Sequence, residues 1–367
     1  MKTTSVYSLM GLMCAGTRAS GVAPIPSASP CSSIDHCIST TPLTPRFFTN
    51  YSSQRLQFRY GPFTIPPLDV SNGMVDYNFP IPPPCTDCLI TYAQAGMEYP
   101  NGSYANANTS TWLHHAVISN LNRTDATCER AHEPVFASGN ERSAADICVD
   151  GTEKAGYYIA EGDQFWFTAE LMNALNAPQN VVVTFDWEYV PSPPSDFMGV
   201  IPVWLDVDGG CPAHGSEVPV PANQTAFQLG MDPPWTAPFE GDIVWIGSHL
   251  HDGGEALSIF RNMNIMCYSV AVYGEIPGYI DPMPPMNMSG VEGMDGMGMD
   301  VVHISSMGAC EGGRVEVGDQ WSVGAAYNFT AHPGMMEGGK PAPVMGISLM
   351  YVATTAKSKP WVLENYE

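Results

Sequence analysis

Short runs of strand-forming residues, separated by clusters of Gly, Pro and Asn, recur along most of this 367-residue chain. The runs either alternate between apolar and polar residues with period two or are continuously apolar, as β-strands with one or two buried faces do. Long amphipathic helical patterns are missing, and the helix formers at 168–177 make a stretch too short for a convincing helix. The chain is therefore predicted to be all-β, built from antiparallel sandwiches. The predicted strands are 111–121, 164–171, 181–190, 200–207, 242–251, 266–273, 314–329 and 344–354.

The chain is too long for one ordinary hydrophobic core, which predicts two domains. The best junction is 191–196, where Pro-Ser-Pro-Pro-Ser-Asp separates two strong strand patterns. This boundary gives an N-terminal domain at 46–192 and a C-terminal domain at 193–356, followed by a tail at 357–367. The 35 Gly and 33 Pro, with only 14% charged residues, suit short strands and many turns.

Several features predict a secreted glycoprotein. Residues 1–20 have the order of a secretory signal peptide, and residues 21–45 form a Pro/Ser/Thr-rich leader that is predicted to be flexible. No other run approaches the length of apolar sequence that a membrane span needs. Asn-x-Ser/Thr glycosylation motifs occur at Asn50, Asn101, Asn108, Asn122, Asn223, Asn287 and Asn328.

The ten cysteines fit a disulfide-bonded exported protein. Removing the signal peptide also removes Cys14 and leaves an odd number, so one thiol is free or one pairing is unaccounted for. Cys85 and Cys88, in a proline-flanked loop, are predicted to belong to the disulfide framework. Local spacing predicts the pairs Cys31–Cys37, Cys128–Cys148 and Cys267–Cys310.

The formal net charge of −23 argues against nucleic acid and anionic membranes as partners, because both need a basic face. The sequence has no nucleophile elbow of the Gly-x-Ser-x-Gly type, no phosphate-binding loop and no dinucleotide fingerprint. The sequence therefore gives no support for an α/β-hydrolase, a P-loop nucleotide-binding enzyme or a dinucleotide-binding enzyme.

The segment with the clearest chemistry contains His249 and His251, directly after the strand-forming run at 243–246. Residues i and i+2 of a strand leave the same face, so the two imidazoles can bind one metal ion. His114 and His115 are adjacent, and they share a face only where the strand has a bulge or ends. Without a bulge, one histidine belongs to the core and the other to solvent.

Methionines add soft ligands to this set. Met345 begins the last predicted strand, where it is either a core residue or a thioether ligand of the kind that favours Cu(I). The stretch 281–300, which is rich in Met and Gly, is either a copper-collecting loop or an insertion without function.

A His-His pair, a later His-x-His pair and a methionine opening a final strand occur here in that order. The chain thus resembles the copper type II, ascorbate-dependent monooxygenases, the group of peptidylglycine alpha-hydroxylating and dopamine beta-monooxygenases, over roughly residues 90–355. It is also similar to a looser set of exported fungal and plant stress-up-regulated nodulin-type proteins. The resemblance implies two jelly-roll domains in tandem, each with one copper, facing across an open cleft.

Each predicted ligand has a place in that resemblance. His249, His251 and Met345 fall on the oxygen-binding copper site, and His114 and His115 fall on the electron-donating site. Where the family has a third histidine at that second site, this chain has Glu170, a harder ligand that disfavours Cu(I).

The sequence therefore predicts a secreted copper monooxygenase that hydroxylates a C–H bond with O2 and ascorbate. Asp252 is expected to orient His249 or His251. One alternative is a non-catalytic, exported copper-binding or wall-associated protein of the same fold. A second alternative is a cupin-like oxidase, because His249, His251 and Glu255 fit the spacing His-x-His-x3-Glu. The substrate, either a small molecule or a peptide, is not identified by any motif.

Overall fold

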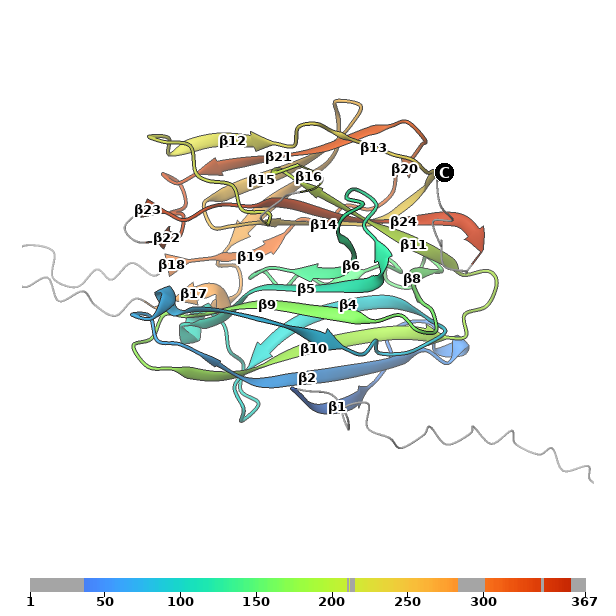
Figure 1. Cartoon of the computed structure of the whole chain (residues 1–367), viewed down its shortest axis with the longest axis horizontal. Coiled ribbons are helices and arrows are strands. Elements are labelled where there is room, and N and C mark those ends of the chain that lie inside the picture. Colours follow the sequence, from blue (N-terminus) through green and yellow to red (C-terminus); the bar gives the residue numbers. More distant parts are fainter. Residues whose placement is uncertain (1–35, 210, 212–214, 283–300, 338–339, 358–367) are drawn as a thin grey trace, which may run out of the picture.

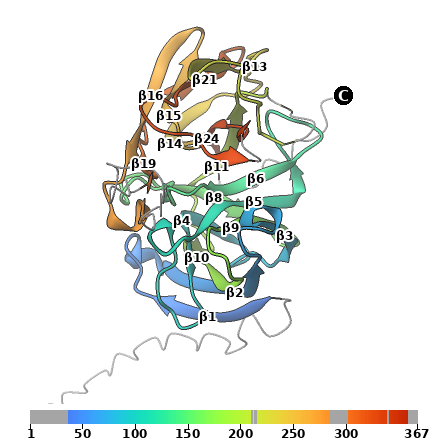
Figure 2. The ribbon, with the colours of Figure 1, turned by 90° about the vertical axis from the view of Figure 1, so that its left-hand side faces the viewer.

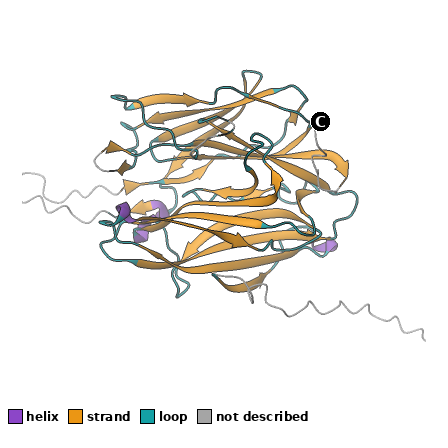
Figure 3. Ribbon diagram, in the orientation of Figure 1, coloured by secondary structure: helices purple, strands orange, loops and turns teal. Residues whose placement is uncertain are grey.

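The structure, a computed structural model, describes residues 36–209, 211, 215–282, 301–337 and 340–357. The predicted signal peptide, most of the leader, most of the Met-rich stretch and the tail lie outside these residues. Regular structure in the described part is almost entirely β-strand, which confirms the all-β prediction (Figure 3). The described helices are four short 3-10 turns: η1 (Thr49–Tyr51), η2 (Ser71–Gly73), η3 (Ala107–Thr109) and η4 (Pro277–Tyr279).

One long sheet runs through both halves of the molecule. Among the described residues, its only parallel pair joins β8 to β11 at Met198 and Gly199, and thereby links an N-terminal arm to a C-terminal arm. In sheet order the strands are β1 (Cys37–Leu43), β2 (Gln54–Ile65), β10 (Gln179–Pro191), β4 (Cys88–Glu98), β8 (Ala155–Ile159), β11 (Met198–Asp206), β24 (Gly346–Lys357), β14 (Gly241–Leu250) and β20 (Arg314–Val315), with β7 (Ala145–Asp146) beside β4.

Two smaller sheets pack on this long sheet. The four-stranded sheet contains β3 (Met74–Ile81), β9 (Phe165–Asn173), β5 (Thr111–Thr124) and β6 (His132–Ser138). The six-stranded sheet contains β12 (Ala226–Gly230), β21 (Gln320–Asn328), β15 (Gly254–Arg261), β16 (Asn264–Tyr273) and β19 (Ile304–Met307), with β13 (Trp235–Thr236) beside β21. Two minor pairs are β17 (Ile280–Asp281) with β18 (Val301–Val302), and β22 (Met336–Glu337) with β23 (Lys340–Pro341).

The sheets stack in layers (Figures 1 and 2). The four-stranded sheet packs on the N-terminal arm, where the rings of Phe167 and Phe185 meet edge to face at 5.2 Å. The six-stranded sheet packs on the C-terminal arm around the buried Trp321 and Val352. The outer face of the four-stranded sheet also faces the C-terminal arm, so this sheet lies between the two arms. Full burial of each large apolar side chain contributes roughly 1.5–3 kcal/mol to folding.

Several contacts connect the two halves across this stack. Tyr351 of β24 donates a 2.8 Å hydrogen bond to the Val135 carbonyl of β6. The Trp235 indole donates to the Ala126 carbonyl at 3.0 Å. Trp245, from the C-terminal half, belongs to the same apolar cluster as the N-terminal core. The halves therefore share buried surface, and the domain boundary at 193 stays a prediction.

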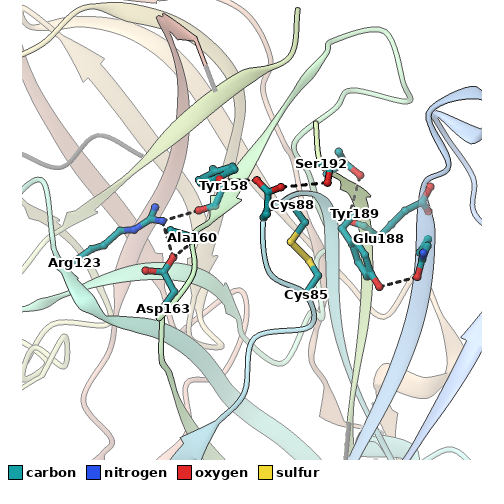
Figure 4. Close-up of a disulfide and its surroundings, with 12 residues drawn as sticks. Cys85, Cys88, Arg123, Tyr158, Ala160, Asp163, Glu188, Tyr189 and Ser192 are labelled. Atoms are coloured by element: carbon teal, nitrogen blue, oxygen red, sulfur yellow. Dashed lines mark hydrogen bonds and ion pairs between the residues drawn. A yellow bond between two sulfur atoms is a disulfide. The ribbon is translucent and has the colours of Figure 1, made fainter. Parts of the chain in front are cut away.

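The disulfides agree with the sequence in part. Cys85 pairs with Cys88 (Figure 4), and Cys267 pairs with Cys310 as predicted. The predicted pair Cys128–Cys148 is wrong.

Cys128 bonds Cys211 instead, and Cys148 is a buried free thiol. The end of the β5–β6 hairpin lies against the loop after β11, a proximity that sequence spacing does not reveal. The predicted partner of Cys37, Cys31, lies outside the described residues.

Two further expectations need correction. The leader is not flexible throughout, because residues 37–43 form β1 and pair with β2. The predicted strand 314–329 is interrupted after Val315 by a turn containing Gly318, whose φ of +88° suits glycine.

None of the described helices has the length and apolar character that crossing a bilayer requires.

Glu133 is expected to make the free energy of unfolding depend on pH. It is buried between Tyr157, whose hydroxyl donates to it at 2.5 Å, and Arg123, whose guanidinium lies 3.7 Å away. Burial raises the pKa of Glu133 from 4.5 to about 7. Its protonated form therefore favours the fold, and this stabilisation is present below pH 4.5 and lost as the pH rises through 7.

We expect Glu133→Gln to lose this dependence. Relative to the variant, the wild-type free energy of unfolding should fall by at most about 3 kcal/mol between pH 4.5 and 7.5. Urea unfolding at a series of pH values measures the difference, with the exposed Glu129→Gln as the matched control. Parallel pH curves for wild type and Glu133→Gln would contradict the assignment.

Candidate metal centre

A bulge in β5 places two adjacent histidines on one side. Leu113 pairs with Leu171 of β9, but the next pair is His115 with Glu170, so His114 is the extra residue of a β-bulge. The rings of His114 and His115 lie only 4.0 Å apart, centroid to centroid. The bulge that the sequence required for shared ligation is thus present.

The second histidine pair comes from the C-terminal arm. His249 lies in β14 opposite Ile347 of β24, and His251 follows immediately after the strand ends at Leu250. β5 and β14 lie in adjacent layers (Figure 1). The rings of the four histidines therefore converge between the four-stranded sheet and the C-terminal arm, at centroid distances of 4.8–5.2 Å between the two pairs.

The convergence is close. The Nε2 atom of His115 lies 3.1 Å from Nε2 of His249 and 3.1 Å from Nε2 of His251. Ligand atoms of His114, His115 and His251 all lie within 4.8 Å of one another, as the donor atoms around one metal ion do. The resemblance implied two coppers across an open cleft, whereas the structure brings both histidine pairs into one cluster.

Each of three rings has an acceptor on its other nitrogen. Nδ1 of His115 donates to Glu170 at 2.6 Å, and Nδ1 of His249 donates to Glu141 at 3.0 Å. Nδ1 of His251 donates to the Pro343 carbonyl at 2.9 Å. With Nδ1 protonated in all three, the Nε2 lone pairs point at one another. This arrangement is repulsive by itself and is relieved by a cation bound between the nitrogens.

Burial keeps the imidazoles of His114, His115 and His251 in their neutral form. It lowers the pKa of His114 and His115 well below the usual 6.5, and the neighbouring histidines add to the effect. Burial, together with His249, lowers the pKa of His251 to about 4. Neutral imidazole is the form that binds metals, so the cluster is ready to bind at physiological pH.

Two predicted roles change. Glu170 was expected as a direct ligand, but its carboxylate hydrogen-bonds His115 and lies 3.8 Å from Nε2 of His114, so it orients a ligand. Asp252 was expected to orient His249 or His251. Instead it accepts a 2.6 Å hydrogen bond from Nδ1 of His303 and a 3.0 Å bond from the Ile304 amide.

Two methionines line pockets that the cluster also lines. Met345, just before β24, lines a cavity with His115 and His249. Met335 lines a narrow pocket with His114 and His251. The predicted thioether is therefore beside the histidines, and a second methionine joins it.

The cupin-like ligand set does not form. Glu255 is exposed and accepts a 3.0 Å hydrogen bond from Asn328. It is not part of the histidine cluster. Asp252 and Gly253 form the turn before β15, and Glu255, the second residue of that strand, is exposed to solvent.

Sequence reasoning missed three residues around the site. Glu141 lies in a polar segment after β6 that is buried, and Gly139 packs so closely that an added Cβ would meet Nδ1 of His249 at 2.1 Å. His303 is buried, and its Nε2 has no partner within the described residues. The run Gly-Asn-Glu-Arg at 139–142 has no metal-ligand spacing, so only its burial identifies it.

Two curated proteins are similar in sequence to most of this chain. The chain is 34% identical over 297 residues to "Probable copper-dependent oxygenase M1" of a Phoma species, covering 80% of this chain and 71% of that protein. It is 33% identical over 262 residues to "Probable copper-dependent oxygenase clz3" of Cochliobolus lunatus, covering 70% of this chain and 77% of that protein.

The chain belongs to this family of copper-dependent oxygenases. No family model matches the chain. Its similarity to solved structures is low. PNGF-II matches at 9% identity and a TM-score of 0.37, over 86% of this chain and 65% of that one. A peptide-N(4)-(N-acetyl-beta-D-glucosaminyl) asparagine amidase matches at 10% identity and a TM-score of 0.39, over 83% and 97%. These values support no shared function.

The donor set fits the metal of this oxygenase family. Copper accepts imidazole nitrogen, and thioether sulfur favours its reduced state. The cluster offers neutral imidazoles whose Nε2 lone pairs converge, with Met345 and Met335 beside it. The carboxylates of Glu170 and Glu141 orient His115 and His249 from behind.

We expect Glu170→Gln to weaken copper binding roughly 10- to 100-fold, because the amide orients His115 without a negative charge. Competition with a copper chelator of known affinity measures the change. Glu255→Gln is the control and should bind copper like the wild type. A loss of metal in Glu255→Gln but not in Glu170→Gln would restore the cupin-like site.

Proposed function

We propose that this copper-dependent oxygenase is a secreted monooxygenase that hydroxylates a C–H bond, with ascorbate as reductant. The carrying observation is the cluster of three imidazole nitrogens that face one another beside a cavity containing Met345. The same ligand types, in the same order, underlie the resemblance to the ascorbate-dependent monooxygenases.

The proposed reaction balances in atoms and electrons. One oxygen atom of O2 enters the substrate C–H bond to give an alcohol, and the other leaves as water. The two electrons and two protons that this requires come from ascorbate, which becomes dehydroascorbate.

The residues of the chain have defined roles in this proposal. His114, His115, His249 and His251 would hold copper, which when bound supplies the one-electron redox chemistry that activates O2. Glu170, Glu141 and the Pro343 carbonyl hold the rings by accepting hydrogen bonds from their Nδ1–H groups.

We propose one copper per chain, since the two histidine pairs form a single cluster. Elemental mass spectrometry of the secreted protein, after copper loading and desalting, should give one copper per chain. His115→Ala, which removes the imidazole shared by both close contacts, should retain less than about one tenth of that copper under competition. Two coppers per wild-type chain would refute this stoichiometry and restore the two-site arrangement.

The proposal of secretion is supported by exposed glycosylation motifs and by disulfides. Asn50, Asn101, Asn108, Asn122 and Asn223 are all exposed. Structural disulfides persist in oxidising compartments. Recovery from the culture medium of a protein that loses mass on deglycosylation would support secretion, whereas retention in the cell without glycans would oppose it.

Turnover is tested with ¹⁸O2, ascorbate and a substrate panel. We expect ascorbate-dependent incorporation of one labelled oxygen atom into product. Met345→Ile, which removes the thioether beside His249, should reduce the rate at least about 10-fold while the fold is retained. Met263→Ile, at a side chain that is 92% exposed, is the matched control. Unchanged turnover in Met345→Ile would remove Met345 from the site, and copper binding without any turnover would favour the non-catalytic copper protein.

A further inference from the structure

Two histidines of the cluster, His115 and His249, line a largely apolar cavity of about 290 Å³. The cavity lies between the outer face of the four-stranded sheet and the C-terminal arm of the long sheet. His115, His249 and Met345 line it together with a set of apolar side chains from both sides: Val117, Ala137, Trp204, Trp245, Ile347 and Leu349.

Strand periodicity explains why metal ligands and apolar walls share this space. Side chains two residues apart on a strand leave the same face. Val117 therefore follows His115 on β5, and Trp245 precedes His249 on β14 by two such steps. Ala137 of β6 lies directly opposite Val117 in the register of the β5–β6 pair. The walls are thus continuations of the strands that carry the ligands.

The cavity offers no counter-charge to an ionic ligand. No Lys or Arg is among the described residues that line it. Its one carboxylate, Glu141, is already engaged: one oxygen accepts from His249 at 3.0 Å and the other accepts from the Gly139 amide at 3.3 Å. Away from the proposed copper, a sulfonate, carboxylate or ammonium group placed among these side chains would lose its hydration without gaining an ionic partner.

From this arrangement we infer that the oxygenase takes an uncharged, carbon-rich substrate, which inserts an apolar group into the cavity toward His115 and His249. That the bound molecule is a substrate rests on the proposed function, whereas the preference for an uncharged apolar ligand rests on the cavity alone. The lining also includes five residues with hydroxyl side chains, Ser138, Ser143, Thr168, Ser216 and Ser248, which suit an uncharged hydrogen-bonding group on such a substrate.

The test compares three ligands with one ring system: naphthalene, naphthalene-1-sulfonate and 1-naphthylmethylammonium. Equilibrium dialysis uses the full-length protein without reductant, both copper-loaded and copper-free, so that ligation of the sulfonate by copper is separated from the preference of the cavity. The salt concentration of about 0.15 M screens the long-range effect of the net charge. We expect naphthalene to bind at least about 10-fold more tightly than either charged ligand. Equal affinities for the three ligands would overturn the inference.

A second experiment uses variants that fill the cavity. Val117→Phe and Ala137→Phe should each weaken naphthalene binding at least about 10-fold, because the added ring occupies the cavity. The matched control is Val270→Phe, on the exposed face of β16, which should leave binding unchanged. Thermal unfolding verifies that each variant is folded. Two folded cavity variants that bind naphthalene like the wild type would place the ligand elsewhere and overturn the inference.

These outcomes separate the cavity from the reaction. Naphthalene binding that both cavity variants abolish would support the inference even if no substrate is oxidised with ascorbate, a result that would refute only the proposed function. Ascorbate-driven turnover of a charged substrate that naphthalene does not inhibit would overturn the inference and leave the proposed function intact.

Discussion

The mutual orientation of three imidazole rings is the constraint on which the site depends. Nε2 of His115 lies 3.1 Å from the Nε2 atoms of both His249 and His251, and each ring is locked by an acceptor on Nδ1. Lone pairs at that distance repel in a buried environment, where little water screens them. The rings hold this geometry because a carboxylate or carbonyl behind each one fixes its tautomer. The protein thus has the coordination geometry built in before the metal arrives.

Holding the rings in this way requires two sheets to keep a fixed separation. β5 brings its histidines from the four-stranded sheet, and β14 brings the others from the C-terminal arm. The Cys128–Cys211 disulfide and the hydrogen bond from Tyr351 to the Val135 carbonyl tie these layers together. Close packing of Gly139 against His249 leaves no room for a side chain between them.

The sequence predicted local features well and long-range proximity poorly. Period-two patterns identified β5, β9 and β14 because their alternation is a property of each strand alone. They missed β2, which carries polar residues and Pro62, and β4, which is nearly continuous in buried residues before it alternates. The histidines were found from spacing and a required bulge. Their convergence into one cluster depends on how two sheets face each other, as do the partners of Cys128 and Asp252, and no local pattern encodes that.

The alternation of β5 and β6 has a consequence for how such an enzyme diversifies. Val117 and Ala137 face the cavity, while their chain neighbours Ala116, Ile118 and Phe136 are fully buried in the core on the opposite face. Selection on the shape of the cavity therefore acts on one set of positions, and selection on folding acts on the interleaved set. Related chains are free to exchange wall residues, and with them the molecules they recognise, while the histidine cluster and the core stay the same. Along these strands, residues that shape the cavity therefore alternate with residues that stabilise the fold.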